Sequence, residues 1–545
     1  MDRSGRETGL KARTHHRSWR RCIHAAVAVM LLALLAGGAD VLHARTLRLA
    51  DQGDAISMDP HSLNDGLQLS LTGNIYEGLT ARGPQLELVP GLARAWRSTG
   101  PRTWRFELRG DVRFHDGAAF NADDVVFSLE RAAAPGSDMR AYVGLIAQVR
   151  RIDDLTVEIE TTQPAPILPE MLSLVYMMDR EWCEAHGALQ PVDKRKGIEN
   201  AASYQANGTG PYRLRAREPG VRTEFERNPD YWGPIEGNVD RVAFTPIGND
   251  ATRVAALVSG EIDMMQPVPV RDIPRLQSDP GLRVRQGPEL RTIFLGMDVA
   301  SEELRFSNVE GRNPFRDRRV RLAMYQAIDI ETIVERIMRG AARPAGLLIA
   351  PGVHGYDAAL DQRQPYDPEA ARRLLAEAGY ADGFEVRMDC PNDRYVNDGE
   401  VCQALAAMFA KIGVRVRLDA QTKSVYFPRI LARQTSLFML GWTPATYDAH
   451  NALYNLVATP DGSGRGQFNL GGYSNSRVDE LTRAIASEVD EERRNDLIAQ
   501  ALRQHRDDVG HLPLHQQSLA WGMRSNIRMV LRADNFIDFK WISID

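Results

Sequence analysis

The stretch from residue 384 to residue 418 places the strongest limit on the fold of this chain. Phe384–Asp389 and Val414–Leu418 have the apolar pattern of strands, and Val401–Ile412 between them has a helical pattern that ends before Gly413. Two neighbouring strands joined through a helix pair in parallel, because antiparallel partners need only a short turn. The sequence therefore predicts an α/β protein that contains a parallel sheet.

Strand-like and helix-like segments alternate over the whole chain after residue 44. Strands are predicted at 46–50, 104–108, 156–161, 291–297 and 437–442, and helices at 68–78, 250–259, 315–340, 478–487 and 491–507. Two more helices have clear starts, because Asn121 and Asp367 are N-cap residues and Pro368 is suited to the first helical position. The helical pattern stops at residue 512. The simplest layout is two α/β lobes, one of them discontinuous, with crossings near residues 286–291 and 510–516.

The first 44 residues have the parts of a secretory signal. Seven Lys and Arg lie within residues 1–24, an apolar run follows from Ala25 to Ala36, and Ala44 ends the segment. The run is too short to span a bilayer, which requires about 20 apolar residues. We therefore predict a signal peptide over residues 1–44, with an uncleaved anchor as the alternative, and a mature protein in the periplasm.

Composition and charge exclude several classes of protein. The chain has 545 residues, 43% apolar and 26% charged, and the part after residue 44 carries a net charge of −9. These values are those of a soluble globular protein with two or three lobes, and not of a disordered, collagen-like or polytopic membrane protein. A mildly acidic body argues against nucleic acid as the main partner.

Three cysteines follow the predicted signal peptide. Cys390 ends a predicted strand and Cys402 lies in the helix after it, so a disulfide between them would close a loop of about a dozen residues and stabilise by about 3 kcal/mol. We predict this disulfide and a buried thiol at Cys183. No CxxC pair is present, so a Cys-His metal site is not predicted.

Motifs of catalysis are absent from the sequence. It contains no HExxH, no Walker A loop, no GxGxxG after a strand and no G-x-S-x-G. His511 and His515 are four residues apart, but Pro513 between them prevents the helix that would place both on one face. The sequence predicts neither an enzyme nor a bound cofactor or metal. A secreted hydrolase remains the alternative from another class.

Ordered motifs along the chain resemble those of a known family. They are Asn74-Ile75-Tyr76-Glu77-Gly78-Leu79, Pro90-Gly91-Leu92-Ala93, Phe114-His115-Asp116-Gly117, Asn121 through Arg131, Gly208-Thr209-Gly210-Pro211-Tyr212, Asn228-Pro229-Asp230-Tyr231-Trp232-Gly233, Ser259-Gly260-Glu261-Ile262-Asp263, the region 318–328, Tyr366-Asp367-Pro368-Glu369-Ala370 and Leu440-Gly441-Trp442. Together they resemble the extracytoplasmic solute-binding proteins of family 5, the peptide and nickel receptors of ABC importers.

The resemblance implies an architecture that agrees with the layout inferred from the alternating segments. It implies a two-lobed periplasmic binding protein of type II, similar to cluster C, with a discontinuous first lobe and a two-segment hinge. On this basis we expect the first part of lobe I at 45–288, including an inserted subdomain at about 80–205, lobe II at 289–512, and the return to lobe I at 513–545.

The resemblance also implies positions that contact the ligand. Arg394 falls where dipeptide-binding relatives place an arginine for the ligand carboxylate, and guanidinium suits this role because it binds a carboxylate with two parallel hydrogen bonds. The alternative is a surface arginine paired with an acid of its own loop. Lys423, Asn64 and Asp65 align with further cleft positions. Each is expected to bind substrate.

The segment after Gly441-Trp442 departs from the peptide-binding pattern. Where those relatives have an acid that holds the peptide amino terminus, this sequence has Ala445. Either Asp448 substitutes for that acid, or the ligand has no α-amino group. Trp442 is a core residue or a cleft wall, and Tyr447 joins it as a candidate contact.

The resemblance implies a function in import. It implies a monomeric periplasmic receptor that captures a peptide or peptide-like solute by hinge closure and delivers it to the permease and ATPase of an ABC importer. The same fold carrying a nickel chelate or another anionic small solute is the alternative.

Overall fold

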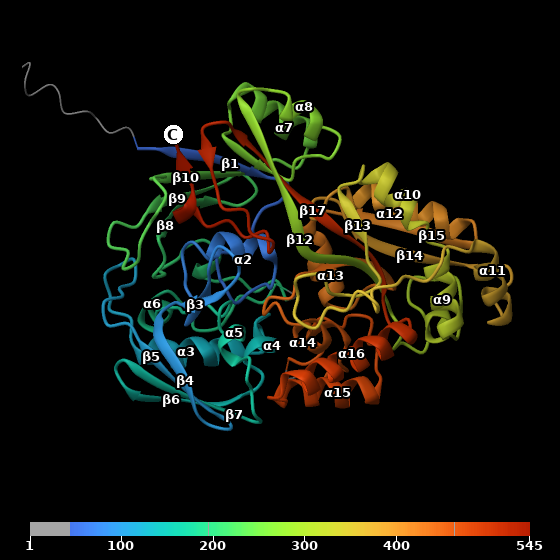
Figure 1. The fold of residues 1–545 in the computed structure, drawn as a ribbon, viewed down its shortest axis with the longest axis horizontal. Helices are drawn as coiled ribbons and strands as arrows, with labels where there is room; N and C mark the ends of the chain where they lie inside the picture. Colours follow the sequence, from blue (N-terminus) through green and yellow to red (C-terminus); the bar gives the residue numbers. More distant parts are fainter. Residues whose placement is uncertain (1–43, 195, 463) are drawn as a thin grey trace, which may run out of the picture. The chain divides into compact units, whose positions relative to one another are not determined.

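One sheet of eleven strands runs through the part of the chain that the structure, a computed structural model, describes: residues 44–194, 196–462 and 464–545 (Figure 1). Its order is β15 (Val414–Gln421), β14 (Phe384–Pro391), β16 (Leu437–Trp442), β12 (Leu282–Met297), β17 (Leu512–Arg524), β11 (Met264–Gln266), β1 (Thr46–Asp51), β10 (Arg241–Pro246), β9 (Arg222–Arg227) and β8 (Tyr212–Glu218), with β13 (Ala342–Pro344) beside β17. Apart from Ala44, the predicted signal peptide lies outside the described residues.

The two long strands β12 and β17 divide this sheet into two parts. On one side lie β11, β1, β10, β9 and β8, which we call the first lobe, and on the other lie β16, β14 and β15, the second lobe. Figure 1 shows β12 and β17 running between them. The predicted parallel unit is confirmed, because β14 pairs in parallel with β15 and α12 (Asp398–Ala410) makes the crossover. The predicted two-lobed α/β fold is therefore confirmed.

A second, smaller sheet belongs to the first lobe. Its four antiparallel strands are β4 (Ala93–Gly100), β5 (Thr103–Leu108), β7 (Thr156–Thr161) and β6 (Ile146–Asp153). The other elements of this lobe are α2 (Gly66–Thr72), β2 (Thr80–Arg82), β3 (Leu88–Pro90), α3 (Ala122–Ala133), α4 (Arg140–Val143), α5 (Leu168–Met171), α6 (Arg180–Ala185), α7 (Asp250–Ser259), α8 (Ile273–Gln277), β18 (Ile527–Arg528) and β19 (Ser543–Ile544).

Helices dominate the remainder of the second lobe. They are α9 (Arg318–Gln326), α10 (Ile330–Thr332), α11 (Pro368–Glu377), α13 (Lys423–Leu431), α14 (Ala449–Ala452), α15 (Ser476–Ser487) and α16 (Glu491–Asp507). Buried apolar side chains form one core cluster under the first lobe and two that serve mainly the second. Among the described residues, no helix combines the length and apolarity needed to cross a membrane.

Several predicted helix ends are confirmed by their capping contacts. The Asn121 side chain accepts a hydrogen bond from the backbone N–H of Asp123 at 2.7 Å, and the Asp124 carboxylate accepts one from the Asn121 backbone N–H at 3.0 Å, which completes a capping box. Asp367 caps α11, which has Pro368 at its first position. Gly260 ends α7 at φ +82°, a left-handed conformation that favours glycine.

Two predicted helices are shorter in the structure. The segment predicted to be helical over 68–78 ends at Thr72, because the Tyr176 hydroxyl donates to the Leu69 carbonyl oxygen at 3.2 Å and the Asn74 side-chain amide donates to the Ile537 carbonyl oxygen at 2.9 Å. The helix predicted over 315–340 is divided into α9, α10 and a π-helical turn at Ile333–Ile337, because Asp329 caps a new start. Tertiary contacts and a second N-cap therefore override the periodicity.

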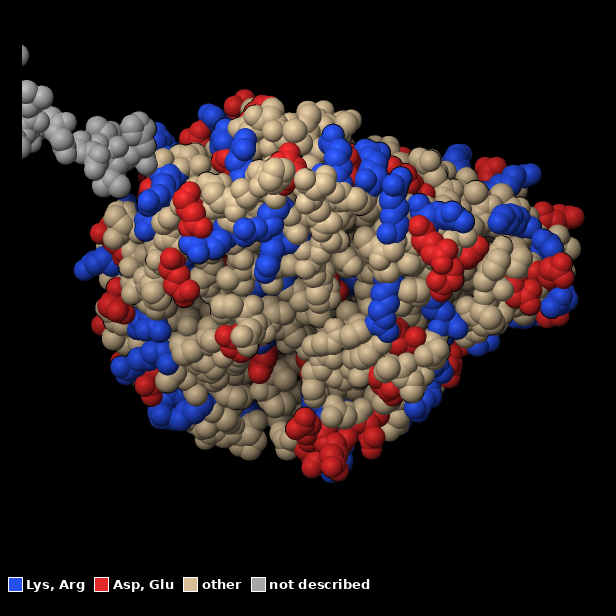
Figure 2. Space-filling view, turned by 45° about the horizontal axis from the view of Figure 1, so that its top comes forward, with Lys and Arg blue, Asp and Glu red and all other residues tan. Residues whose placement is uncertain are grey.

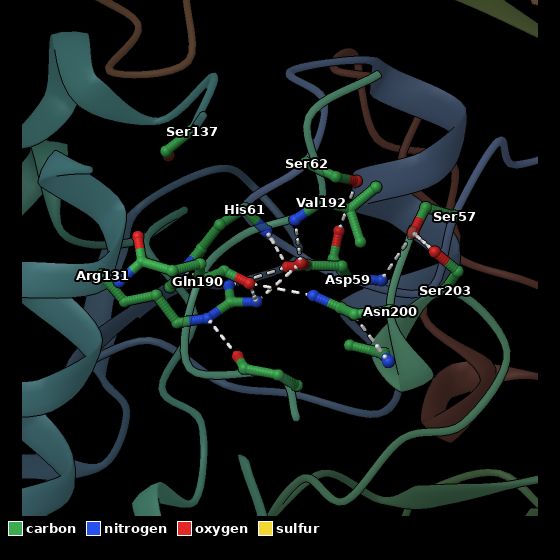
Figure 3. Close-up of polar contacts among 12 residues, drawn as sticks. Ser57, Asp59, His61, Ser62, Arg131, Ser137, Gln190, Val192, Asn200 and Ser203 are labelled. Carbon is green, nitrogen blue, oxygen red and sulfur yellow. Dashed lines mark hydrogen bonds and ion pairs between the residues drawn. The ribbon is translucent and has the colours of Figure 1, made fainter. Parts of the chain in front are cut away.

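A buried ion pair fixes the loop that leads into α2 (Figure 3). The Arg131 guanidinium donates to both oxygens of Asp59, at 2.9 and 2.6 Å, and neither side chain is exposed. Asp59 also accepts from the Val192 N–H at 2.9 Å, and His61 lies between the Arg131 guanidinium and the Tyr176 carbonyl oxygen. Because this loop continues directly to residues 64 and 65, the network holds the position from which they enter the site.

Basic and acidic side chains lie next to one another on the face drawn in Figure 2. Blue and red groups are interspersed there over both lobes, so this face has no basic stripe of the kind on which nucleic-acid binding depends.

Candidate functional site

A cavity lies between the two lobes. The first lobe and the C-terminal segment contribute Leu63, Asn64, Asp65, Gly66, Leu69, Leu174, Asp534 and Phe536, the strand β12 contributes Arg291, and the second lobe contributes Arg394, Tyr395, Phe427, Ile430, Leu431, Leu440, Gly441, Trp442, Thr443, Ala445, Tyr447, Phe468 and Leu470. The wall is therefore mostly apolar and aromatic, with a few charged groups. This is the usual construction of a small-molecule site.

Asp65 joins the two lobes through an ion triad. It caps α2, and its carboxylate lies 2.7 Å from Arg394 Nε and 3.0 Å from Lys423 Nζ of the second lobe. Burial would raise the pKa of Asp65, but the two cations outweigh burial and hold the pKa well below its usual range. The sequence offered all three residues as candidate ligand contacts. The structure shows that Asp65 also forms ion pairs with the other two.

The loop that carries Arg394 is fixed at both ends. At its end, the buried Asp398 carboxylate accepts the backbone N–H groups of Arg394 and Tyr395 at 3.0 and 2.9 Å. Burial raises the pKa of Asp398 to about 7 despite these hydrogen bonds. A disulfide joins Cys390, in β14, to Cys402, in α12, with 6.7 Å between their Cα atoms. Cys183 is buried and outside any disulfide.

Replacing Cys390 and Cys402 together with alanine is expected to lower the free energy of unfolding by about 3 kcal/mol, because the unfolded chain regains the entropy of a 12-residue loop. Denaturant unfolding of the oxidised protein and the double variant measures the difference. Cys183→Ser is the comparison that changes a thiol without changing the crosslink. A double variant as stable as the wild type would show that the disulfide does not constrain the unfolded chain.

Two arginines converge beside Gly66. Arg291 Nε lies 2.7 Å from Glu289, just as Arg394 Nε lies 2.7 Å from Asp65. A Cβ at Gly66 would lie 3.2 Å from Arg291 Nη2 and 3.5 Å from Arg394 Nη2, so the two guanidinium groups approach the same point. A glycine leaves this point open, and guanidinium groups bind carboxylates well.

The cavity wall also contains a second polar cluster. The Tyr447 hydroxyl donates to Asp534 at 2.7 Å, and the Arg532 guanidinium donates to both oxygens of the same carboxylate, at 3.2 and 2.5 Å. The Arg82 guanidinium lies 4.7 Å from the centre of the Tyr447 ring. Tyr447 of the second lobe is therefore bonded to the first-lobe side of the cavity.

Trp442 is both a core residue and part of the wall. It ends β16, its ring packs 5.0 Å from Phe468, and its indole N–H donates to Asn451 at 2.9 Å. The nearby Thr443 hydroxyl is buried and has no hydrogen-bond partner among the described residues. Asn64 also lines the cavity, and its amide donates to the Tyr142 hydroxyl at 3.0 Å.

Asp448 lies elsewhere, which corrects its expected role. Its two oxygens accept the Arg494 guanidinium at 2.6 and 2.8 Å, and His354 Nδ1 lies 2.9 Å away. Burial would raise the pKa of Asp448, but these partners hold it well below its usual range. Asp448 is not part of the cavity wall and caps α14 instead. Lys423 also lies off this wall and borders a smaller polar compartment next to it.

The sequence did not single out Arg291, Tyr395 or Asp534. The sequence does contain an indication that Arg291 is a site residue, because it is a charged residue next to the apolar strand segment 292–297. A buried charge in such a place requires a partner or a ligand. Asp534 lies in a segment without a distinguishing pattern, and only the fold brings it to the cavity.

The sequence profile of the bacterial extracellular solute-binding proteins, family 5 Middle, matches residues 87–464 of this chain. A glutathione-binding protein of Pectobacterium atrosepticum is 29% identical over 434 residues, which cover 78% of this chain and 79% of that protein. A dipeptide-binding protein of Escherichia coli is 27% identical over 452 residues, which cover 77% of this chain and 81% of that protein.

A solved structure shares the fold over nearly the whole chain. It is the ABC transporter-associated periplasmic binding protein DppA of Helicobacter pylori in complex with the peptide STSA, with a TM-score of 0.82 and 23% identity, covering 92% of this chain and 98% of that chain. The profile match, which spans well over half of the sequence, establishes the family. The protein belongs to the bacterial extracellular solute-binding proteins of family 5.

Proposed function

We propose that this protein is the substrate-binding component of an ABC importer and captures a peptide or peptide-like solute between its two lobes. The observation that carries the proposal is the cavity walled by both lobes, with the guanidinium groups of Arg291 and Arg394 converging beside Gly66. A peptide offers the carboxylate that these groups bind and apolar side chains that the aromatic wall covers. Relatives that bind glutathione and dipeptides support this ligand class.

Capture by hinge closure follows from the strands between the lobes. Pairing of β12 with β17 is irregular between Pro288 and Thr292, and β16 joins β12 from Thr292 onward. We place the hinge here, with lobe I at 45–288 and 513–545, its inserted subdomain at about 80–205, and lobe II at 289–512. A ligand that contacts both lobes stabilises the closed state by the free energy of the contacts it gains there.

The proposed setting is the periplasm, after removal of the signal peptide. The closed, loaded monomer is recognised by the permease and ATPase subunits of the importer. The protein then acts without catalysis, because the signal is the conformation and not a change in the solute.

A peptide that binds the folded protein is expected to raise the free energy of unfolding by about 2.7 kcal/mol when its free concentration is 100 times its dissociation constant. It is also expected to change the tryptophan fluorescence, because Trp442 lies on the wall. A panel of di-, tri- and tetrapeptides, each with a free and with an acetylated amino end, tests both signals on protein freed of retained ligand. Trp442→Phe should keep the stabilisation and lose most of the fluorescence change. A panel that changes neither signal would contradict the proposed function.

A further inference from the structure

The cationic groups of the cavity have unused donors. Arg291 Nε donates to Glu289 at 2.7 Å, and Arg394 Nε lies 2.7 Å from Asp65 in an ion pair without a hydrogen bond. The terminal nitrogens of both arginines make no hydrogen bond to any described residue. Both arginines are largely buried, with side-chain exposures of 6% and 11%. Buried guanidinium N–H groups normally find acceptors. The convergence of the two Nη2 atoms at Gly66 therefore prepares a place for an anionic group of the ligand.

Both acids of the cavity wall are, by contrast, already paired with cations, although Asp65 Oδ2 has no hydrogen bond among the described residues. Asp65 accepts from Lys423 Nζ at 3.0 Å and the Gln68 N–H at 3.2 Å, and its other oxygen lies 2.7 Å from Arg394. Asp534 accepts from Arg532 through both oxygens and from the Tyr447 hydroxyl. An ammonium group of a ligand would have to displace one of these cations to reach a carboxylate.

The polar compartment beside the cavity contains three more acids. Asp51 accepts the Gly53 N–H at 2.9 Å and the Gln266 amide at 2.6 Å, and Asp393 accepts the Lys423 N–H at 2.6 Å. Glu289 has one oxygen on Arg291 and one without a hydrogen bond.

That free oxygen of Glu289 is a poor site for an ammonium group. The compartment is also walled by Arg291, Arg394 and Lys423, so an ammonium group there would lie among three other cations. Like charges in a buried site repel strongly because little water screens them.

We propose that the cavity selects a carboxylate-bearing solute that has no free amino group, such as a peptide whose amino end is acylated or absent. The inference rests on the proposed function and narrows its substrate class. The ligand carboxylate binds between Arg291 and Arg394 beside Gly66, and the uncharged remainder lies against the aromatic wall.

Titration calorimetry with Leu-Phe, N-acetyl-Leu-Phe and N-acetyl-Leu-Phe amide measures separately how the ammonium group and the carboxylate of a dipeptide affect its affinity. N-acetyl-Leu-Phe is expected to bind at least tenfold more tightly than Leu-Phe, because the free amine has no unpaired acid to meet. The amide is expected to bind at least tenfold more weakly than N-acetyl-Leu-Phe. Arg291→Gln should weaken N-acetyl-Leu-Phe at least tenfold and leave the amide unchanged.

A gain-of-charge variant tests the same inference from the other side. Ala445 lies on the wall, so Ala445→Asp supplies the missing acid and should reduce or reverse the preference for the acetylated peptide, whereas Ala445→Asn, of equal size, should not. Leu-Phe binding to the wild type as tightly as N-acetyl-Leu-Phe would overturn the inference and leave the proposed function standing. If none of the three peptides binds to folded protein, the proposed function fails and the inference fails with it.

Discussion

Replacing Asp59 with asparagine is expected to lower the free energy of unfolding by about 3–5 kcal/mol, the range for removing one partner of a buried ion pair. The Arg131 guanidinium would remain in a site where neither side chain of the pair is exposed, without its counter-charge. Denaturant unfolding measures the loss. Ligand affinity should fall as well, because the loop that ends at Asp65 depends on the same network (Figure 3).

An exposed ion pair provides the matched control for this variant. Glu107 pairs with Arg94 and Arg97, whose side chains are 66% and 60% exposed, so Glu107→Gln should change the unfolding free energy by less than about 1 kcal/mol. Both variants exchange one carboxylate for one amide and differ in burial. Equal effects of the two would mean that burial does not set the strength of the Asp59–Arg131 pair.

Local signals in the sequence determined much of the fold correctly. The helices that begin after Asn121 and Asp367 were predictable, because their caps satisfy N–H groups within the first turn. The unit of β14, α12 and β15 was predictable from its periodicity alone. The end of α2 at Thr72 was not, because it depends on Tyr176, more than a hundred residues later.

The site shows the same division between local and distant causes. Arg394, Trp442, Tyr447, Asn64 and Asp65, which the sequence offered as candidate substrate contacts, line the cavity. The ion pairs of Asp65 with Arg394 and Lys423, 329 and 358 residues later in the chain, were not predictable. A single sequence does not show which residues of two lobes come into contact.

Asp448 shows why spacing alone misplaces a side chain. The backbone of Tyr447 has φ +55°, a left-handed conformation, and the next side chain leaves the cavity wall. The partner that neutralises Asp448 is Arg494, 46 residues further along the chain. Counting residues after Trp442 gives the distance along the chain but not the direction of the side chain.

The largest expected response to pH comes from buried histidines. Five of them are at most 5% exposed: His61, His450, His505, His511 and His515. Burial lowers the pKa of His61, His450 and His515 to about 4 and that of His505 to about 3, and it lowers the pKa of His511 well below the usual value. Each is therefore neutral in the folded protein at pH values where it is charged in the unfolded chain.

Lowering the pH from 7 to 5 is expected to destabilise the fold strongly. The unfolded chain binds protons at these histidines below pH 6.5, and the folded protein binds them only near pH 4 or at lower pH, so unfolding takes up protons and acid favours it. Asp398 and Asp124 act in the opposite direction, since burial raises their pKa values to about 7 and about 6. The five histidines less these two acids give a net uptake of about three protons near pH 5.5, which corresponds to about 4 kcal/mol per pH unit. The half-buried His115, whose pKa burial also lowers to about 4, adds to this uptake.

The proton uptake can be assigned to individual side chains by single substitutions. In His61, Nε2 donates to the Tyr176 carbonyl oxygen at 2.9 Å while Nδ1 accepts from Arg131 at 3.0 Å, and glutamine can provide both a donor and an acceptor. His61→Gln should therefore reduce the uptake by about one proton, seen as a shallower dependence of the unfolding free energy on pH between 5 and 6.5. A slope that His61→Gln does not alter would mean that His61 is already charged in the folded protein, and its hydrogen bond from Arg131 could then not exist, because a charged imidazole has no acceptor nitrogen.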